Sequence, residues 1–420
     1  MPAQLRELQA RRRAARARRR RRGAVALAAA LAIGSGGLAV IVGGAGDGEE
    51  APEVPAVPAP GGSPPSMPAS SPQPPAASSP EPSPEATPQP PRLDARRLIG
   101  ERLIAGYDGL EPPRGLRRMI QRGDLAGVIL FEDNIAGHRR TRRAVATLQR
   151  IPRPRAVRPP LAVMVDQEGG LVERLSGPPT ASAQEMGSRR SAFARRQGAA
   201  TARSLRRAGI NVNLAPVLDV VRRSSAIGAE HRSFARRPAQ VITAGVAGFA
   251  RGLRAGGVAA TAKHFPGLGA AEVNTDEASQ RIALSRRRLR RVDERPFASF
   301  IRAGGELVML GLATYPAFSN RPAALSRSIA SGELRRRLGF EGVSISDSLD
   351  ASAARSFGGR RRVAIEAARA GTDLLLYGDW RTARLAGRVL RHELLSGHLD
   401  RDGFEASAER VLELRRGLGG

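Results

Sequence analysis

Short apolar runs recur eight times between residues 93 and 420, and most are followed by an Arg/Ala-rich stretch with helical spacing. Short buried runs that alternate with helical segments are typical of parallel strands in βα units. Eight such units predict an α/β fold, a single TIM-type (β/α)8 barrel, rather than an open sheet. The candidate strands are residues 103–106, 127–131, 161–165, 211–220, 258–262, 307–311, 343–346 and 373–377.

The residues before this region divide into three segments of different composition. Residues 1–23 form a basic tail, and residues 24–46 form an uncharged apolar run that matches the thickness of a bilayer. The arginines before the run predict a transmembrane anchor with a cytoplasmic N-terminus. A cleaved signal segment, which would give a secreted protein, is the alternative. Residues 47–92 are rich in proline and predict a disordered linker.

This organisation predicts a single-pass protein of the cell membrane, with a domain at residues 93–420 outside the cytoplasm. The absence of cysteine excludes disulfides, thiolate metal sites and a cysteine nucleophile. Aromatic residues make up only 4 % of the chain, which argues against a base-stacking nucleic-acid surface. Residues 92–420 carry a net charge of +26, which we interpret mostly as solvated arginine, and we expect no nucleic-acid partner. Attraction to anionic cell-wall polymers or lipid headgroups remains open.

Polar residues that can carry chemistry stand at the ends of several predicted strands. Asp166 ends the third, Asp219 the fourth, Lys263 and His264 the fifth, and Asp347 the seventh. In a TIM barrel these strand ends meet at one face, so we expect one site there. Lys263 is the single lysine among 68 basic residues, which suggests that its position needs a compact ammonium rather than a guanidinium.

Five ordered motifs give the chain a family resemblance. They are D-Q-E-G-G-x-V-x-R at 166–174, N-x-A-P-V-L-D-V at 213–220, R-S-F at 232–234, K-H-F-P-G at 263–267 and S-D-S-L at 346–349. Together they resemble the family 3 glycoside hydrolases, especially bacterial β-N-acetylglucosaminidases (β-N-acetylhexosaminidases) that act on peptidoglycan fragments. The resemblance covers roughly residues 97–420 and implies a carbohydrate substrate.

The resemblance also implies roles for individual residues. Asp347 matches a nucleophile that forms a covalent glycosyl-enzyme in a retaining mechanism, which needs a second acid/base group about 5 Å away. Asp219 matches a motif position, and a purely structural role for it stays open. No cofactor and no metal site is expected. The residues that match sugar-holding positions are Asp166, Arg174, Arg232, Lys263 and His264.

The chain departs from the family at the acid/base group. That branch usually carries a histidine in an Asp-Ser-His sequence after the fifth strand, where this chain has Asn274, Thr275 and Asp276. Two further family histidines are replaced by Leu268 and Leu312. Asp276 or the neighbouring Glu277 is then the candidate acid/base, since a carboxylic acid commonly serves glycosidases.

Other interpretations stay open at this point. The chain could be a sugar- or wall-binding protein with a degenerate site, or a second group from elsewhere could act. Phosphate could replace water as the acceptor. A β-glucosidase-type specificity on the same fold is a further alternative.

Overall fold

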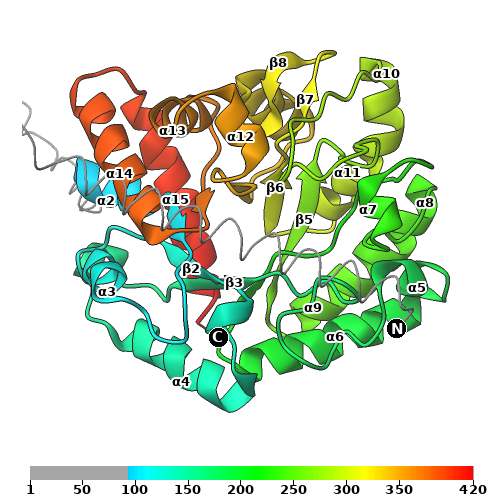
Figure 1. Cartoon of the computed structure of the whole chain (residues 1–420), viewed down its shortest axis with the longest axis horizontal. Helices are drawn as coiled ribbons and strands as arrows, with labels where there is room; N and C mark the ends of the chain where they lie inside the picture. The colour runs from blue at the N-terminus through cyan, green and yellow to red at the C-terminus, as the bar shows by residue number, and fades with distance from the viewer. Residues whose placement is uncertain (1–92, 420) are drawn as a thin grey trace, which may run out of the picture. The chain divides into compact units, whose positions relative to one another are not determined.

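The computed structural model describes residues 93–419, which fold into a parallel barrel surrounded by helices (Figure 1). The strands follow one another around the barrel in sequence order, and β10 pairs with β1. A bridge between Ile345 and Leu374 closes the ring, so the predicted (β/α)8 barrel is confirmed. The barrel strands are β1 (Leu103–Ala105), β2 (Gly127–Leu130), β3 (Ala162–Val165), β4 (Val212–Asn213), β5 (Ala259–Phe265), β6 (Leu307–Leu310), β9 (Val343–Ser346) and β10 (Leu375–Tyr377).

Helices cover the outside of the barrel (Figure 1). The α-helices are α2 (Ala95–Gly100), α3 (Arg114–Gln121), α4 (Gly137–Arg150), α5 (Ala183–Gly187), α6 (Ser191–Arg207), α7 (Ala226–Ala229), α8 (Pro238–Val241), α9 (Arg251–Ala255), α10 (Arg286–Arg288), α11 (Arg295–Arg302), α12 (Ser352–Phe357), α13 (Arg360–Arg369), α14 (Trp380–Leu395) and α15 (Arg401–Gly417). Wider helical turns at Ile242–Ala250, Leu289–Asp293 and Ser328–Arg337, and 3-10 turns at Glu132–Asn134, Arg155–Val157 and Ala323–Leu325, complete the helical elements.

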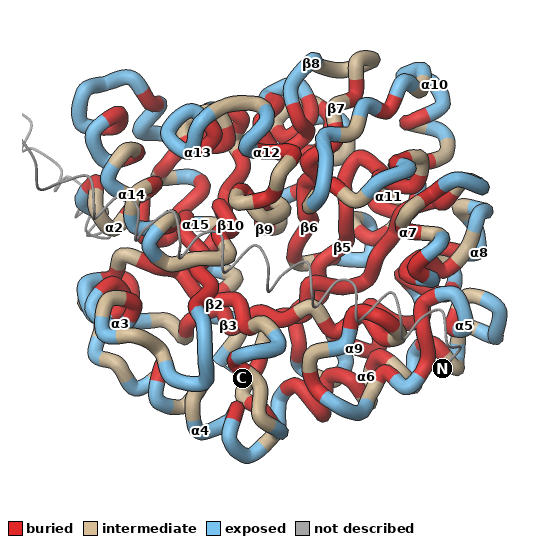
Figure 2. Tube along the Cα trace, in the orientation of Figure 1, coloured by how far each residue is buried: buried red, intermediate tan, exposed pale blue. Residues whose placement is uncertain are grey.

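Two apolar layers hold the barrel together, because successive side chains of a strand point to opposite faces. One layer fills the interior and includes Ile104, Met164 and Leu307. The other lies between the strands and the outer helices and includes Val128 and Val163. Burial is concentrated along the strands, while the outer helices alternate buried and exposed residues (Figure 2).

The C-terminal helix α15 contributes to the interior layer and is tied to the rest of the fold by a buried ion pair. Val411 of α15 packs within the interior cluster. Arg415 is fully buried and is paired with Glu101, which is also fully buried. The same guanidinium donates to the carbonyl oxygens of Val157, Pro159 and Pro160, which precede β3. These contacts stand at the N-terminal ends of the strands and leave the opposite face for the polar strand-end residues.

Most strands lie within one or two residues of their predicted bounds, and β4 and β5 differ most. The predicted strand at 211–220 is regular only over β4, because Pro216 has no N–H to donate to a neighbour. The chain still runs beside β5, since Lys263 N–H donates to Pro216 and Leu218 N–H donates to Lys263. β5 continues to Phe265, three residues beyond its predicted end at 262, so Lys263 and His264 lie within the strand. The two-stranded sheet of β7 (Thr314–Tyr315) and β8 (Ser319–Pro322) was not predicted.

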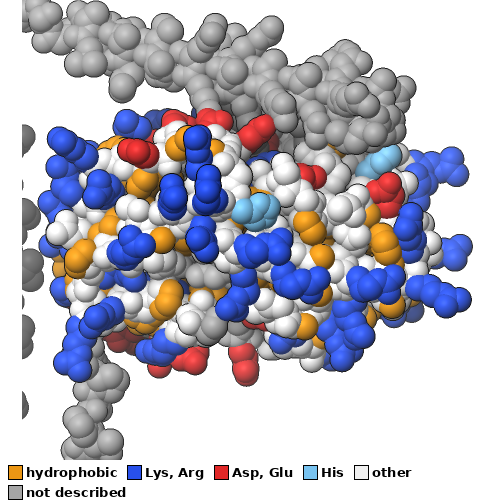
Figure 3. All heavy atoms as spheres, turned by 90° about the horizontal axis from the view of Figure 1, so that it is seen from below, with side chains coloured by type: hydrophobic (Ala, Val, Ile, Leu, Met, Phe, Trp, Pro, Cys, Tyr) orange, Lys and Arg blue, Asp and Glu red, His pale blue; other side chains and the backbone are white. Residues whose placement is uncertain are grey.

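The predicted basic tail, anchor or signal segment and linker all fall within residues 1–92, which lie outside the described residues. Among residues 93–419, no helix combines the length and the apolar character needed to span a membrane. Arginine side chains are spread across the face seen in Figure 3, as expected for a solvated basic surface. A few arginines depart from that expectation, because Arg102, Arg232 and Arg415 are buried.

Candidate active site

The polar residues of the motifs meet at the C-terminal ends of the barrel strands. Asp166 directly follows β3, and Asp347 directly follows β9. Lys263 and His264 are the fifth and sixth residues of β5 and are almost fully buried. The peptide bond between them is cis. The expected convergence of the strand ends is therefore present.

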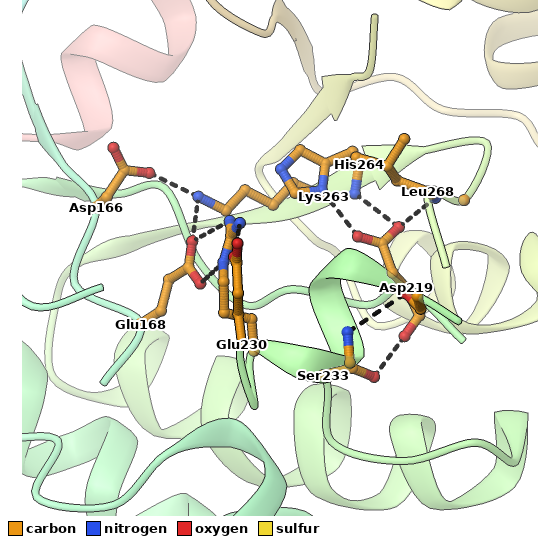
Figure 4. A network of polar contacts seen from close by, with 12 residues as sticks. Asp166, Glu168, Asp219, Glu230, Ser233, Lys263, His264 and Leu268 are labelled. Atoms are coloured by element: carbon orange, nitrogen blue, oxygen red, sulfur yellow. Dashed lines mark hydrogen bonds and ion pairs between the residues drawn. The ribbon is translucent and has the colours of Figure 1, made fainter. Parts of the chain in front are cut away.

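Lys263 stands between two carboxylates (Figure 4). Its Nζ lies 2.6 Å from Oδ1 of Asp166 and 2.7 Å from Oε1 of Glu168. Glu168 also accepts a bidentate pair of hydrogen bonds from Arg232, from Nε to Oε2 at 2.8 Å and from Nη2 to Oε1 at 2.9 Å. Nη1 of Arg232 donates to Oε2 of Glu230 at 3.3 Å. Two buried cations and three carboxylates thus form one continuous network that fixes the direction of each side chain.

The charges of this network hold one another in the ionised state. Burial alone would raise the pKa of Glu168, but Arg232 and Lys263 bring it well below its ordinary value. The pKa of Asp166 is lowered against the same burial by Lys263 and Arg174. Burial opposes the charge of Lys263, yet Asp166 and Glu168 raise its pKa. The site therefore presents fixed cations and anions, which suit the binding of a neutral ligand with many hydroxyl groups.

Asp219 orients His264. Its Oδ2 lies 2.8 Å from Nδ1 of the ring, and its Oδ1 accepts from the backbone N–H groups of His264 and Leu268 at 3.2 and 2.6 Å. Ser233 Oγ donates to the Asp219 carbonyl at 2.6 Å (Figure 4). Because Nδ1 is engaged by Asp219, Nε2 is the ring nitrogen available to a ligand. Asp219 thus has the contacts of a positioning residue.

The surroundings of Asp347 raise its pKa. Burial is the main cause, and the nearby carboxylate of Asp276 acts in the same direction, while His264 and Lys263 lower it. Its Oδ1 accepts from the N–H of Ser348 at 2.7 Å. Asp347 is therefore within electrostatic range of Lys263 and His264 of β5 and of the candidate acid Asp276.

The two candidate acids, Asp276 and Glu277, differ in their burial. Asp276 is half-buried and influences the pKa of Asp347, whereas Glu277 is exposed. Leu268 and Leu312, which replace two family histidines, are buried in the apolar layer outside the barrel. Both leucines are therefore apolar packing residues of that layer.

Glu168 lies within one of the motifs but was not predicted to belong to the site, and Glu230 was not predicted either. Glu168 stands two residues after Asp166 in a loop, and nothing in the local pattern shows that it faces the β5 lysine across 95 residues of chain. The buried charge of Lys263 was the available signal, since a buried ammonium needs more than one anionic partner. Within residues 93–419, no group of three or more His, Asp or Glu side chains could hold a metal ion.

The family model of the glycosyl hydrolase family 3 N terminal domain matches residues 101–414. The chain belongs to family 3 of the glycoside hydrolases. It is 34 % identical over 334 residues to an uncharacterized secreted glycosyl hydrolase of Arthroderma benhamiae, covering 76 % of this chain and 92 % of that one. It is 36 % identical over 271 residues to a beta-hexosaminidase of Stenotrophomonas maltophilia, covering 61 % and 77 %.

A solved structure has the same fold. The family 3 beta-N-acetylglucosaminidase from Paenibacillus sp. str. FPU-7 superposes with a TM-score of 0.73 at 30 % identity. The similarity covers 78 % of this chain, and it spans 64 % of the longer Paenibacillus chain. The family that the five motifs resemble is thereby confirmed, and the chain is a glycoside hydrolase.

Proposed function

We propose that this family 3 hydrolase removes terminal β-linked N-acetylhexosamine from cell-wall-derived glycans with retention of configuration. The observation that carries the proposal is Asp347, a carboxylate at the end of β9 that is flanked by Lys263, His264 and Asp276. The names of the Stenotrophomonas and Paenibacillus relatives support the N-acetylhexosamine specificity.

In the first step Asp347 is the nucleophile. One carboxylate oxygen bonds to the anomeric carbon as the glycosidic bond breaks, and the bonding electrons go to the leaving oxygen. The carboxylic acid of Asp276 donates its proton to that oxygen, so the aglycone leaves as a neutral alcohol. This step requires Asp347 to be ionised, and the proximity of His264 and Lys263 favours that form.

In the second step the Asp276 carboxylate accepts a proton from water, and the water oxygen displaces Asp347 from the anomeric carbon. The sugar leaves with its original configuration, and both carboxyl groups return to their starting states. We propose that Asp166, Arg174, Arg232, Lys263 and His264 hold the sugar during both steps. The ionised network around Lys263 supports this role, because it offers donors and acceptors in fixed directions.

The nucleophile is tested with Asp347→Asn on a chromogenic β-N-acetylglucosaminide. We expect turnover to fall by about 10⁴-fold or more, because the covalent step is lost. A fluorinated mechanism-based inhibitor should add one sugar mass to the wild type and none to the variant. Equal turnover of both proteins would refute the role of Asp347. Saturable sugar binding without any adduct on wild type would indicate a binding protein instead.

The acid/base is tested by comparing Asp276→Ala with Glu277→Ala. We expect Asp276→Ala to lose activity and to regain it in azide, which needs no deprotonation to attack the glycosyl-enzyme. Glu277→Ala, exposed in the same turn, is the matched control and should retain activity. Rescue of Glu277→Ala alone would reverse the assignment.

We propose that the domain acts outside the cytoplasm, either held by an anchor at residues 24–46 or released after cleavage. The charge pattern of the first 46 residues supports an exported chain, and the Arthroderma relative is named as secreted. Membrane fractionation with N-terminal sequencing of the isolated protein separates the two forms. Recovery of an uncleaved chain in the cytosol would refute both.

Binding of the basic surface to anionic wall polymers should weaken as salt increases.

A further inference from the structure

The loop that carries Asp276 is bonded directly to the segment that follows Asp347. The backbone N–H of Ser352 donates to the carbonyl oxygen of Asp276 at 3.3 Å, and the N–H of Ala353 donates to Thr275 at 3.2 Å. Ser352 and Ala353 are the first two residues of α12, which begins shortly after Asp347. Two backbone hydrogen bonds therefore join the loops of the proposed acid and the proposed nucleophile.

These bonds replace the usual cap of a helix. The first N–H groups of an α-helix have no partner within the helix, and a Ser, Thr, Asp or Asn side chain commonly accepts from one of them. α12 has Ala351 at this position and makes no side-chain cap bond. Carbonyl oxygens of the Asp276 loop take the place of the cap. Separation of the loop from α12 would leave unpaired groups on both elements.

The loop is also shaped by its own contacts. Asn274 Oδ1 accepts from the Asp276 N–H at 3.0 Å, and the Asn274 carbonyl accepts from the Glu277 N–H at 2.9 Å. Thr275, between them, is buried. At the base, Gln280 Oε1 accepts from two backbone N–H groups of the loop, each at 3.3 Å. The turn that presents Asp276 is thus fixed at both its base and its tip.

We propose that the first turn of α12 is a latch that holds the Asp276 loop closed beside Asp347, so that the chain itself positions the proton donor before sugar binds. The proposal rests on the proposed acid/base role of Asp276. Asn274 and the N–H groups of Ser352 and Ala353 are its positioning groups. Each backbone hydrogen bond should raise the equilibrium ratio of closed to open loop by about fivefold.

Ser352→Pro removes one of the two latch bonds, together with the hydroxyl that accepts from Arg355 Nη2 at 3.5 Å. Proline fits the first position of a helix, and Ala351, at φ −64° and ψ 156°, already has the extended geometry that a residue before proline requires. Ser191→Pro is the matched control, since Ser191 is the first residue of α6 and follows Arg190 at φ −62° and ψ 145°.

The first measurement is hydrogen–deuterium exchange of the peptide that spans residues 270–281. We expect exchange about fivefold faster in Ser352→Pro and unchanged in Ser191→Pro. Equal exchange in wild type and Ser352→Pro would overturn the latch. This result does not depend on catalysis, so it remains decisive even if the wild type cleaves no N-acetylglucosaminide and the proposed function fails.

The second measurement separates proton donation from general damage. For an aryl β-N-acetylglucosaminide with a poor leaving group, kcat/KM of Ser352→Pro should fall about fivefold. A strongly acidic phenol leaves without a proton, so its kcat/KM should stay near that of wild type. Equal losses for both substrates would overturn the positioning role.

A second pair of variants covers the case in which Ser352→Pro fails to fold. Asn274→Ala removes the acceptor for the Asp276 N–H, and Asn274→Asp retains an oxygen there. Asn274→Ala should show the same leaving-group dependence, and Asn274→Asp should restore most of the lost activity. Equal kinetics of the alanine variant and wild type would overturn the role of Asn274.

Discussion

Glu168→Gln tests the network that fixes Lys263 and Arg232. Glu168 is 3 % exposed and supplies both of its oxygens to Arg232 and one to Lys263. Breaking a buried ion pair by neutralising one partner costs about 3 kcal/mol or more. A folded region of about 330 residues has an unfolding entropy near 0.7 kcal/mol/K, so Tm should fall by about 4 °C. Because the two cations would also lose their alignment, kcat/KM should fall by about a hundredfold.

The assay is differential scanning calorimetry at neutral pH, with Glu173→Gln as the control. Glu173 is an exposed carboxylate of the same segment, and its substitution should move Tm by less than about 1 °C. The pH dependence adds a second readout. The pKa of Glu168 is lowered from its ordinary 4.5, so its contribution is present above that value and is lost as pH falls. Equal Tm values for both variants, or parallel acid profiles of wild type and Glu168→Gln, would refute the reasoning.

Three further substitutions have defined outcomes. Asp347→Asn should abolish activity and raise Tm at pH 7. Burial raises the pKa of Asp347, so its charged form lowers the free energy of unfolding as pH rises above 3.8. An unchanged or lower Tm of the variant in calorimetry would contradict this. Asp219→Asn should lower kcat/KM by about tenfold or more by releasing His264, and unaltered kinetics would exclude this role. Arg415→Leu should cost about 3–5 kcal/mol in urea unfolding, and adding Glu101→Leu should recover part of it; a larger loss in the double variant would count against a buried-charge penalty.

The positions of the strands could be predicted because their signal is local. Each of the eight predicted runs contains or overlaps a barrel strand. A barrel strand is buried on both of its faces, so its sequence is a short apolar run that can be recognised locally. The regular length of β4 could not be predicted, because it depends on pairing around Pro216 with β5. The β7–β8 hairpin was missed for a different reason, since its strands are short and mixed in polarity and give little local signal.

The candidate site divides in the same way. Asp166, Lys263, His264 and Asp347 could be placed at one face once the barrel was predicted, because strand ends converge there. The ion pair between Lys263 and Glu168 could not be predicted, because the path of the loop that follows a strand is set by its packing against other segments. The sequence also left Asp276 and Glu277 equivalent, while their exposure and the contacts of the turn distinguish them.

The sequence by itself determined the barrel, the family and the residue types at the site, because periodicity and ordered motifs are properties of the chain. Only the tertiary structure decided which charges pair, which carboxyl group approaches Asp347 and how its loop is held. Those outcomes depend on distances between segments far apart in the chain. The bond from the first turn of α12 to the Asp276 loop joins residues 76 positions apart, and no local pattern encodes it.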